Sequence, residues 1–188
     1  MKRDKQILQA ACKLFVERGF EPVSIDEIGR AVGVSGPAIY RHFSSKAEIL
    51  SVICHQTVDR LVELAGPPRD DPREELDALV AGQVKLVMKH PELVIVYENE
   101  ERFLPDNLRR PVRRRQKEHA ERWISALVRL RPRESRADLE ITAFATIGLL
   151  LSVPRWPRSI RQHPSLEEHL KAIALNNTEA KMGFASVS

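Results

Sequence analysis

Residues 24–46 of this 188-residue chain read SIDEIGRAVGVSGPAIYRHFSSK, and this stretch decides the fold. Ser24 and Glu27 have the spacing of a capping box, in which each side chain binds the other residue's backbone amide at the start of a helix. Gly33 ends that helix after about two turns. Pro37 then occupies the first turn of a second short helix, where its missing N–H costs little. The stretch therefore predicts two short helices joined by a tight turn.

The second of these helices is predicted to be buried on one side only. Ile39 and Phe43 are four residues apart, so both face the neighbouring helices. At about 100° per residue, Pro37 and Arg41 point most directly away from them. This pattern is typical of a helix-turn-helix, whose second helix enters the major groove of DNA. We expect Arg41 to contact guanine, and Pro37 and Ala38 to touch thymine methyl groups.

The rest of the chain continues in helical periodicity on both sides of this stretch. An apolar stripe precedes it and ends at Gly19, a residue that suits the end of a helix. A second capping pattern at Ser45 opens a long helix, and the Gly- and Pro-rich stretch 66–72 predicts a linker. Besides the two short helices, we predict helices at residues 4–18, 46–65, 73–89, 92–103, 106–130, 135–153 and 166–182.

These elements predict an all-α fold of about nine helices. The N-terminal part, residues 1–61, is expected to be a three-helix DNA-binding domain with its helix-turn-helix motif at residues 24–43. The C-terminal part, residues 66–188, is expected to be a helical ligand-binding and dimerisation domain.

Composition narrows the function classes. The net charge of +4 and the pI of about 9.3 permit DNA binding, but they argue against a sequence-blind, nucleoid-type binder. Two cysteines without a Cys-x-x-Cys pair predict reduced thiols in the cytoplasm. The longest apolar run, residues 141–153, is too short to predict a membrane span. The six histidines lack metal-ligand spacing, and no nucleotide-binding or metalloprotease motif occurs, so we expect neither an enzyme nor a cofactor.

Residues 1 to about 61 resemble the N-terminal domain of the TetR family of one-component transcriptional regulators. The resemblance is carried by Ile7, Ala10, Phe15, Gly19, Ser24, Ile28, Ala31, Gly33, Val34 and the run Tyr40-Arg41-His42-Phe43-Ser44-Ser45-Lys46. It implies phosphate contacts at Ser24, Tyr40, His42 and Lys46. Many members have threonine at the position of Ala38 and a polar residue at that of Gly36, which leaves this chain few hydrogen-bonding groups for base readout. The expected DNA-binding residues are Ser24, Ser35, Gly36, Pro37, Ala38, Tyr40, Arg41, His42 and Lys46.

The second half resembles the family only in architecture. The resemblance implies a repressor that a small hydrophobic or amphipathic effector releases from a palindromic operator. The last two predicted helices, 135–153 and 166–182, are apolar enough to form a homodimer seam, with a core inside one chain as the alternative. We expect the effector among residues 73–153, although for each single candidate plain core packing is the favoured interpretation. The candidate ligand-binding residues are Val87, Tyr97, Phe103, Trp123, Leu127, Phe144 and Ile147.

Two charged blocks allow two interpretations. Residues 98–101 are acidic, and residues 109–117 hold five arginines and one lysine. The two blocks are either solvated helix faces that pair with each other, or the arginines bind an anionic effector such as the phosphates of an acyl-CoA. The stretch distantly resembles family members that control fatty-acid or steroid breakdown, which favours an acyl-CoA or lipid-like effector.

Overall fold

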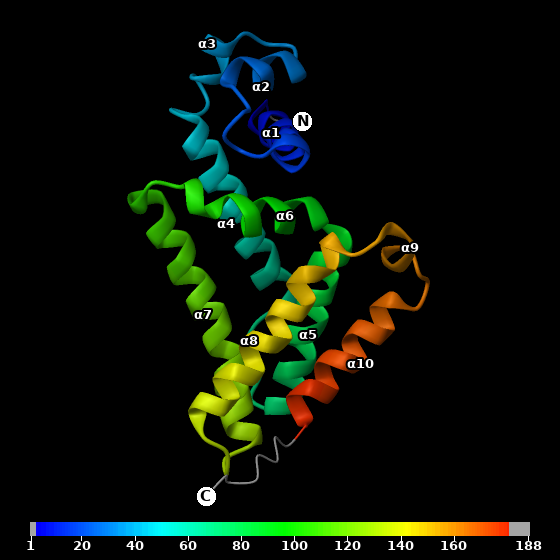
Figure 1. The fold of residues 1–188 in the computed structure, drawn as a ribbon. Coiled ribbons are helices and arrows are strands. Elements are labelled where there is room, and N and C mark those ends of the chain that lie inside the picture. The colour runs from blue at the N-terminus through cyan, green and yellow to red at the C-terminus, as the bar shows by residue number, and fades with distance from the viewer. Residues whose placement is uncertain (1–2, 181–188) are drawn as a thin grey trace, which may run out of the picture.

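The computed structural model describes residues 3–180, which form ten α-helices and two short 3-10 helices, with no strand in that range (Figure 1). This confirms the predicted all-α class. The α-helices are α1 (Arg3–Arg18), α2 (Ile25–Ala31), α3 (Gly36–Ile39), α4 (Lys46–Ala65), α5 (Pro72–Lys89), α6 (Pro91–Glu100), α7 (Asp106–Leu130), α8 (Arg136–Ser152), α9 (Arg158–Arg161) and α10 (Leu166–Glu179). The 3-10 helices are η1 (Glu101–Phe103) and η2 (Val153–Arg155).

The predicted helix boundaries differ from the observed ones at a few places. The helix predicted at 92–103 ends at Glu100 and tightens into η1, so that prediction was three residues too long. The four-residue α9 was not predicted, because one turn is too short to show helical periodicity. The expected end of the last helix, at Met182, lies outside the described residues.

The start of α4 also differs in detail from the prediction. Ser45 accepts a hydrogen bond from the Glu48 amide at 3.0 Å, as a capping residue does. The Glu48 carboxylate, however, accepts from the amide and hydroxyl of Ser44, at 2.5 and 2.6 Å, and not from the amide of Ser45. Of the two hydrogen bonds of the predicted capping box, the one to the Ser45 hydroxyl is present, and the Glu48 carboxylate binds Ser44 in place of Ser45.

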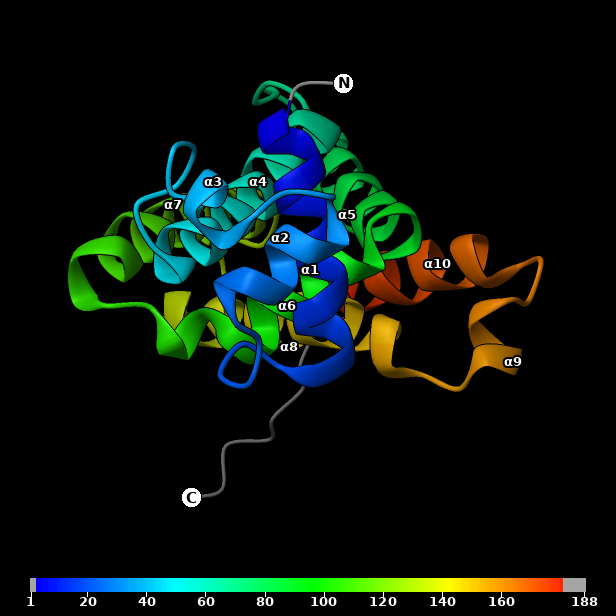
Figure 2. The same cartoon turned by 90° about the horizontal axis from the view of Figure 1, so that it is seen from above.

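Helices α1–α3 form one end of the molecule, and α4 runs from that end into the remaining helices (Figures 1 and 2). One hydrophobic core surrounds Phe15 and Ile39 and extends to Val96 of α6. A second core surrounds Trp123 and takes in Ala65, at the end of α4. Helices α4 and α6 thus contribute to both cores, and they connect the two ends of the molecule physically.

The junction of α4 and α5 is closely packed. A Cβ atom at Gly82 would lie 2.7 Å from the backbone nitrogen of Ala65, so only glycine allows this approach. Arg122 of α7 donates to the Glu75 carboxylate at 2.8 Å and to the Gly66 carbonyl at 3.1 Å. These contacts fix the end of α4 against α5 and α7.

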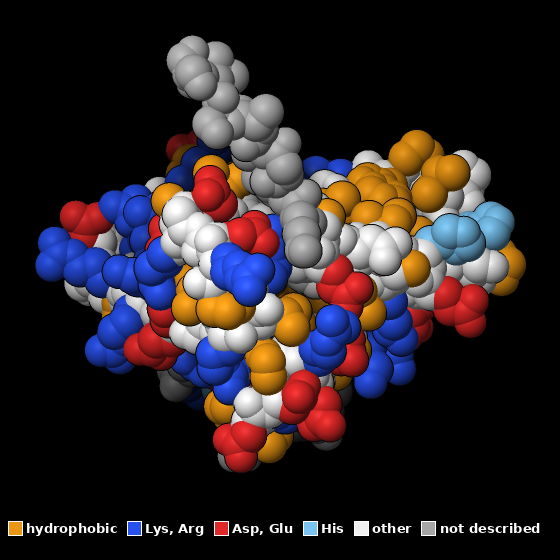
Figure 3. All heavy atoms as spheres, turned by 90° about the horizontal axis from the view of Figure 1, so that it is seen from below, with side chains coloured by type: hydrophobic (Ala, Val, Ile, Leu, Met, Phe, Trp, Pro, Cys, Tyr) orange, Lys and Arg blue, Asp and Glu red, His pale blue; other side chains and the backbone are white. Residues whose placement is uncertain are grey.

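Helices α8 and α10 lie side by side (Figure 1). They leave several large apolar side chains exposed. The stretch Arg136–Arg155 is long and apolar enough to cross a membrane, which the shorter run counted in the sequence did not reveal. Only 39% of its most apolar 18-residue segment is buried, although the helix packs on α5, α7 and α10. Figure 3 shows hydrophobic side chains gathered on the side that holds α8, α9 and α10. The large exposed apolar residues there are Ile141, Phe144, Ile160 and Ile173.

Candidate nucleic-acid interface

The first helix of the motif begins with the predicted capping box. The Ser24 hydroxyl accepts from the Glu27 amide at 3.2 Å, and Glu27 accepts from the Ser24 amide at 2.8 Å. Arg18 donates to the same carboxylate at 2.6 Å. These hydrogen bonds, that of Arg18 first, lower the pKa of Glu27 to about 2. The start of α2 is thereby joined to the end of α1.

The turn between α2 and α3 depends on Gly29, which the sequence analysis did not single out. Its carbonyl accepts from the amides of Val32 and Val34, at 3.1 and 2.9 Å. A Cβ atom at position 29 would lie 2.8 Å from the Val34 carbonyl oxygen, in the backbone of the turn itself. Gly33 adopts a φ of 72°, as expected for the residue that breaks the helix. Gly29 thus allows the backbone of the turn to approach closely, and Gly33 adopts the positive φ that the turn needs.

Helix α3 ends at Ile39, earlier than the predicted spacing of Ile39 and Phe43 implies, and it presents the predicted face to solvent together with the turn that follows it. Ile39 is fully buried and Phe43 is 6% exposed, so both anchor the helix from below. Tyr40 is 57% exposed, and Pro37 and Arg41 are also exposed at the end of the molecule formed by α1–α3 (Figure 2). The outer face that the sequence predicts for this segment is thus exposed.

Three other predicted contact residues border this face with different local roles. Ser24 is exposed, but its hydroxyl already serves the α2 cap. Ser35 is exposed at the N-cap position of α3 and forms no side-chain capping bond there. His42 Nδ1 lies 2.6 Å from the Asp4 carboxylate of α1, which orients the imidazole beside α3.

Two of the predicted contact residues have structural roles within the protein. Lys46 Nζ donates to the carbonyls of Phe20, Glu21 and Val23, at 2.8, 2.9 and 2.7 Å. All three ammonium protons are therefore engaged within the protein, which leaves none for a phosphate. Gly36 is buried, and a Cβ atom there would lie 1.8 Å from Asp26 Oδ1, so the residue allows α2 and α3 to approach closely.

The loop before α2 connects the end of the molecule formed by α1–α3 to α6. The buried Glu100 carboxylate accepts from the Phe20 amide at 3.1 Å. The Phe103 ring stacks on the Phe20 ring with centroids 5.9 Å apart, and Lys46 lies 4.3 Å above the same ring. The end of α6 and η1 are therefore in direct contact with this loop, and Lys46 joins the loop to the start of α4.

A cavity of about 200 Å³ lies among α4, α5, α6, α7 and α8. Of the predicted ligand-binding residues, Tyr97, Phe144 and Ile147 line it. Val87, Trp123 and Leu127 belong to the second core instead, and Phe103 packs on the first. The lining residues that sequence reasoning missed are Thr57, Val58, Leu61, Gln83, Leu86, Glu98, Gln116, His119, Ala120, Gly148 and Leu151.

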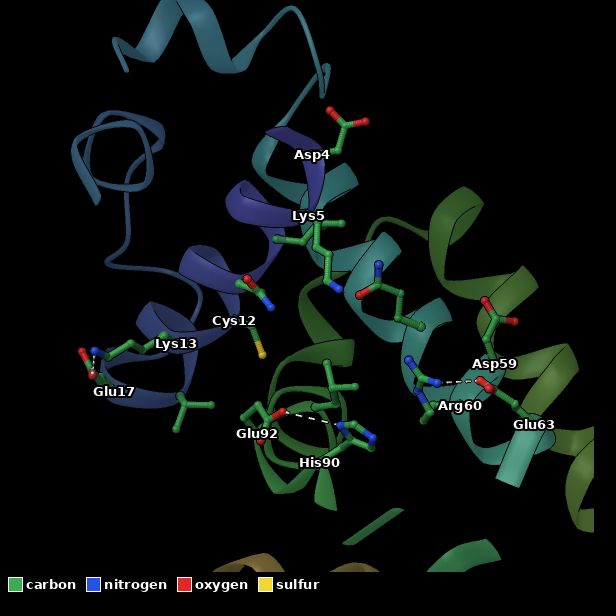
Figure 4. A pocket seen from close by; sticks show the side chains of 15 residues that line it. Asp4, Lys5, Cys12, Lys13, Glu17, Asp59, Arg60, Glu63, His90 and Glu92 are labelled. Carbon is green, nitrogen blue, oxygen red and sulfur yellow. Dashed lines mark hydrogen bonds and ion pairs between the residues drawn. The ribbon is translucent and has the colours of Figure 1, made fainter. Parts of the chain in front are cut away.

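A larger, open groove of about 950 Å³ is lined by α1, α4 and the start of α6 (Figure 4). Acidic and basic side chains alternate along it, and some of them pair, such as Arg60 with Glu63 at 2.7 Å. Cys12 is buried at its floor, and burial raises the pKa of this thiol to about 12. The thiol is therefore protonated at neutral pH and unsuited to nucleophilic chemistry.

The arginine block at the start of α7 is largely paired with carboxylates. Arg113 donates to Glu101 at 2.8 Å, in agreement with the interpretation that the two charged blocks pair. Arg115 lies 2.5 Å from Asp59 of α4. Arg109 pairs with Asp106, and Arg114 lies 3.8 Å from Glu118. The block thus joins α7 to η1 and to α4, and α4 and α7 both line the cavity.

Two family models match the chain with this arrangement of helices. The model of bacterial regulatory proteins of the tetR family matches residues 7–53, and the tetracyclin repressor-like C-terminal domain matches residues 69–159. The chain belongs to the TetR family. The helix-turn-helix described above lies within the first match, and most of the cavity-lining residues lie within the second.

The names of curated relatives of this TetR-family chain include both a transcriptional activator and a transcriptional repressor. It is 44% identical over 61 residues to the transcriptional activator FasR of Mycolicibacterium smegmatis, covering 32% of the chain and 28% of FasR. It is 25% identical over 129 residues to the repressor KstR2 of Mycobacterium tuberculosis, covering 66% of the chain and 64% of KstR2. The chain therefore spans less than two thirds of the length of these curated relatives.

Solved structures of the family share the fold over nearly the whole chain. PfmR from Thermus thermophilus has a TM-score of 0.80 and 26% identity, and the match covers 93% of this chain and 97% of PfmR. AibR, solved in complex with isovaleryl coenzyme A and operator DNA, has a TM-score of 0.80 and 22% identity over the same shares of each chain. The second likeness concerns the fold alone.

Proposed function

We propose that this TetR-family regulator binds a palindromic operator as a homodimer and acts as a ligand-responsive repressor in the cytoplasm. The observation that supports this most strongly is the segment made of α3 and the turn after it, in which Ile39 and Phe43 are buried while Pro37, Tyr40 and Arg41 face solvent. In this proposal residues 1–61 read DNA, and residues 66–188 bind the effector and the second subunit. We assign no catalytic activity to the chain.

The proposed dimer forms through α8 and α10. Both helices carry large apolar side chains that one chain leaves uncovered, with Ile141 58% and Ile173 45% exposed. Two copies joined by this face would bury those side chains in a four-helix seam. A two-fold dimer would present two α3 helices to half-sites about 34–36 Å apart.

The proposed effector site is the cavity among α4–α8. Tyr97 and Glu98 of α6 line it, and Glu100, at the end of the same helix, holds the Phe20 amide. An effector that displaces α6 would therefore shift the DNA-reading end and change the spacing of the two α3 helices. It must prefer the non-binding state, and a coupling of about 1–3 kcal/mol is typical of such switches.

We propose an acyl-CoA or lipid-like compound as the effector class. AibR, of the same fold, was solved with isovaleryl coenzyme A and operator DNA together, so this fold accommodates both kinds of ligand. The apolar cavity would take the acyl part. The arginines of α7, already close to α4 and η1, would reach the phosphates by exchanging their carboxylate partners, of which Asp59 is exposed and Glu101 partly buried.

Substitution of Arg41 tests the DNA-reading role of α3. An operator is first selected in vitro from random duplexes with the unsubstituted protein. Arg41→Ala is then expected to lower operator affinity about ten- to a hundredfold, because a bidentate arginine–guanine contact contributes ~1–3 kcal/mol of discrimination. Fluorescence anisotropy at fixed salt measures the loss, and a new selection with the variant should show relaxed preference at one base per half-site.

Arg133→Ala is the matched control, since it removes the same charge from the exposed α7–α8 loop at the far end of the molecule. Its operator affinity is expected to stay within about twofold of the unsubstituted protein, because a charge distant from DNA is screened by salt. Equal losses in the two variants would mean that α3 does not read the bases.

A further inference from the structure

The cavity contains two buried polar side chains with hydrogen-bonding atoms that remain unpaired. Gln83 of α5 is fully buried and His119 of α7 is 5% exposed, and both line the cavity. Among the described residues, neither amide atom of the Gln83 side chain has a partner, and His119 Nδ1 has none either. A buried polar atom without a partner costs about 1–3 kcal/mol, so these three atoms favour a ligand that binds them.

The protonation of His119 is fixed by its other ring nitrogen. Trp123 Nε1, which can only donate, lies 3.1 Å from His119 Nε2. Nε2 is therefore the acceptor, and the neutral ring carries its proton on Nδ1. Burial lowers the pKa of His119 to about 4, so the ring is neutral at pH 7. His119 thus offers one N–H, on a ring held in place by the tryptophan.

The remaining lining has no positive charge to balance an anion. None of the lining residues is a lysine or arginine, and the one carboxylate among them, Glu98, is exposed at the edge. Placing a carboxylate or phosphate beside Gln83 would require burying an uncompensated negative charge, which is far more costly than burying a neutral dipole. Most of the other buried wall residues are apolar, such as Leu86 and Val58.

We propose that Gln83 and His119 form a recognition site for an uncharged carbonyl group on a small apolar effector. The ligand's carbonyl oxygen accepts from His119 Nδ1–H, and the Gln83 carboxamide pairs with the polar atoms next to that carbonyl. Amides, esters and thioesters have this chemistry, whereas a free carboxylate does not. The cavity, smaller than the ~300–1,000 Å³ of sites for drug-sized molecules, suits a short chain. The inference rests on the proposed function in that it takes this ligand to be the effector.

Calorimetric titration of the full chain, without DNA, at pH 7.5 tests this site with a matched pair of probes. Octanamide and octanoate have the same shape and differ in charge. Octanamide is expected to bind at least tenfold more tightly than octanoate. Gln83→Leu is expected to weaken octanamide about tenfold while the chain stays folded, because the substitution also removes two unpaired buried atoms. Circular dichroism melting checks the fold.

Gln116→Leu is the control, because it makes the same change at a lining glutamine that is exposed. Its octanamide affinity is expected to change less than twofold. Binding of neither probe means that solvent satisfies the three atoms, and this overturns the proposal. Equal affinities for the two probes, or equal losses in the two variants, overturn it as well. A failure of operator binding in a separate anisotropy experiment would concern the proposed function and not this site.

Discussion

Ile141→Glu and Ile173→Glu are each expected to turn the dimer into a monomer and to lower operator affinity at least about a hundredfold. The two side chains are 58% and 45% exposed on α8 and α10, where the second subunit is proposed to cover them. A glutamate there would be buried without a partner in the dimer but solvated in the monomer. A monomer binds only one half-site and loses the avidity of two linked sites, which is about 10²–10⁴-fold.

Sedimentation equilibrium and operator anisotropy, run on the same samples, measure the two effects. Val62→Glu on α4 is the matched control, because Val62 is a 41% exposed apolar residue on a helix that is not part of the proposed seam. This variant should remain dimeric and bind the operator with nearly unchanged affinity. A dimer that persists in both α8 and α10 variants would place the subunit interface elsewhere.

His119→Gln is expected to flatten the loss of stability between pH 6.5 and pH 4. Burial, with a smaller contribution from Arg122, lowers the pKa of His119 to about 4. The unfolded chain takes up a proton near pH 6.5, whereas the folded chain resists it until about pH 4. The free energy of unfolding is therefore unaffected by His119 above pH 6.5, and it decreases as the pH falls from 6.5 toward 4. The shift corresponds to about 3 kcal/mol of unfolding free energy.

Urea unfolding at pH 7 and pH 4.5, at one fixed protein concentration because a dimer's stability depends on it, measures this effect. Glutamine can still accept from Trp123 Nε1, so the variant removes the titration and keeps the hydrogen bond. His163→Gln, at an exposed histidine before α10, is the control and should show the pH profile of the unsubstituted chain. An identical profile in the His119 variant would show that this histidine already binds a proton in the folded protein.

The helix-turn-helix was predictable because its determinants are local. The Ser24–Glu27 box, the break at Gly33 and the Ile39–Phe43 pair each act within a few residues, and the structure contains all three. The roles of Gly36 and Lys46 were not predictable in this way. Each depends on a residue that is ten or more positions away in sequence, Asp26 for the glycine and the Phe20 loop for the lysine.

The cavity was harder to predict because several helices build it. Periodicity identifies the buried face of α7, but it does not distinguish His119, which faces the cavity, from Trp123 one turn later, which faces the core. The sequence therefore indicates ligand-binding residues only by their aromatic or aliphatic type, and three of the seven predicted residues line the cavity. Gln83 was overlooked because a polar residue on an apolar helix face has no sequence signal of its own; the unpaired amide becomes informative only within the packed structure.

The central claim, that two α3 helices read DNA as a symmetric pair, is tested most directly by a hydroxyl-radical footprint on the sequence selected in vitro. The account predicts an inverted repeat, protected in two patches on one face of the duplex, with half-site centres one helical turn or a whole multiple of it apart. Uniform protection along the DNA, or a selected sequence without two-fold symmetry, would contradict it.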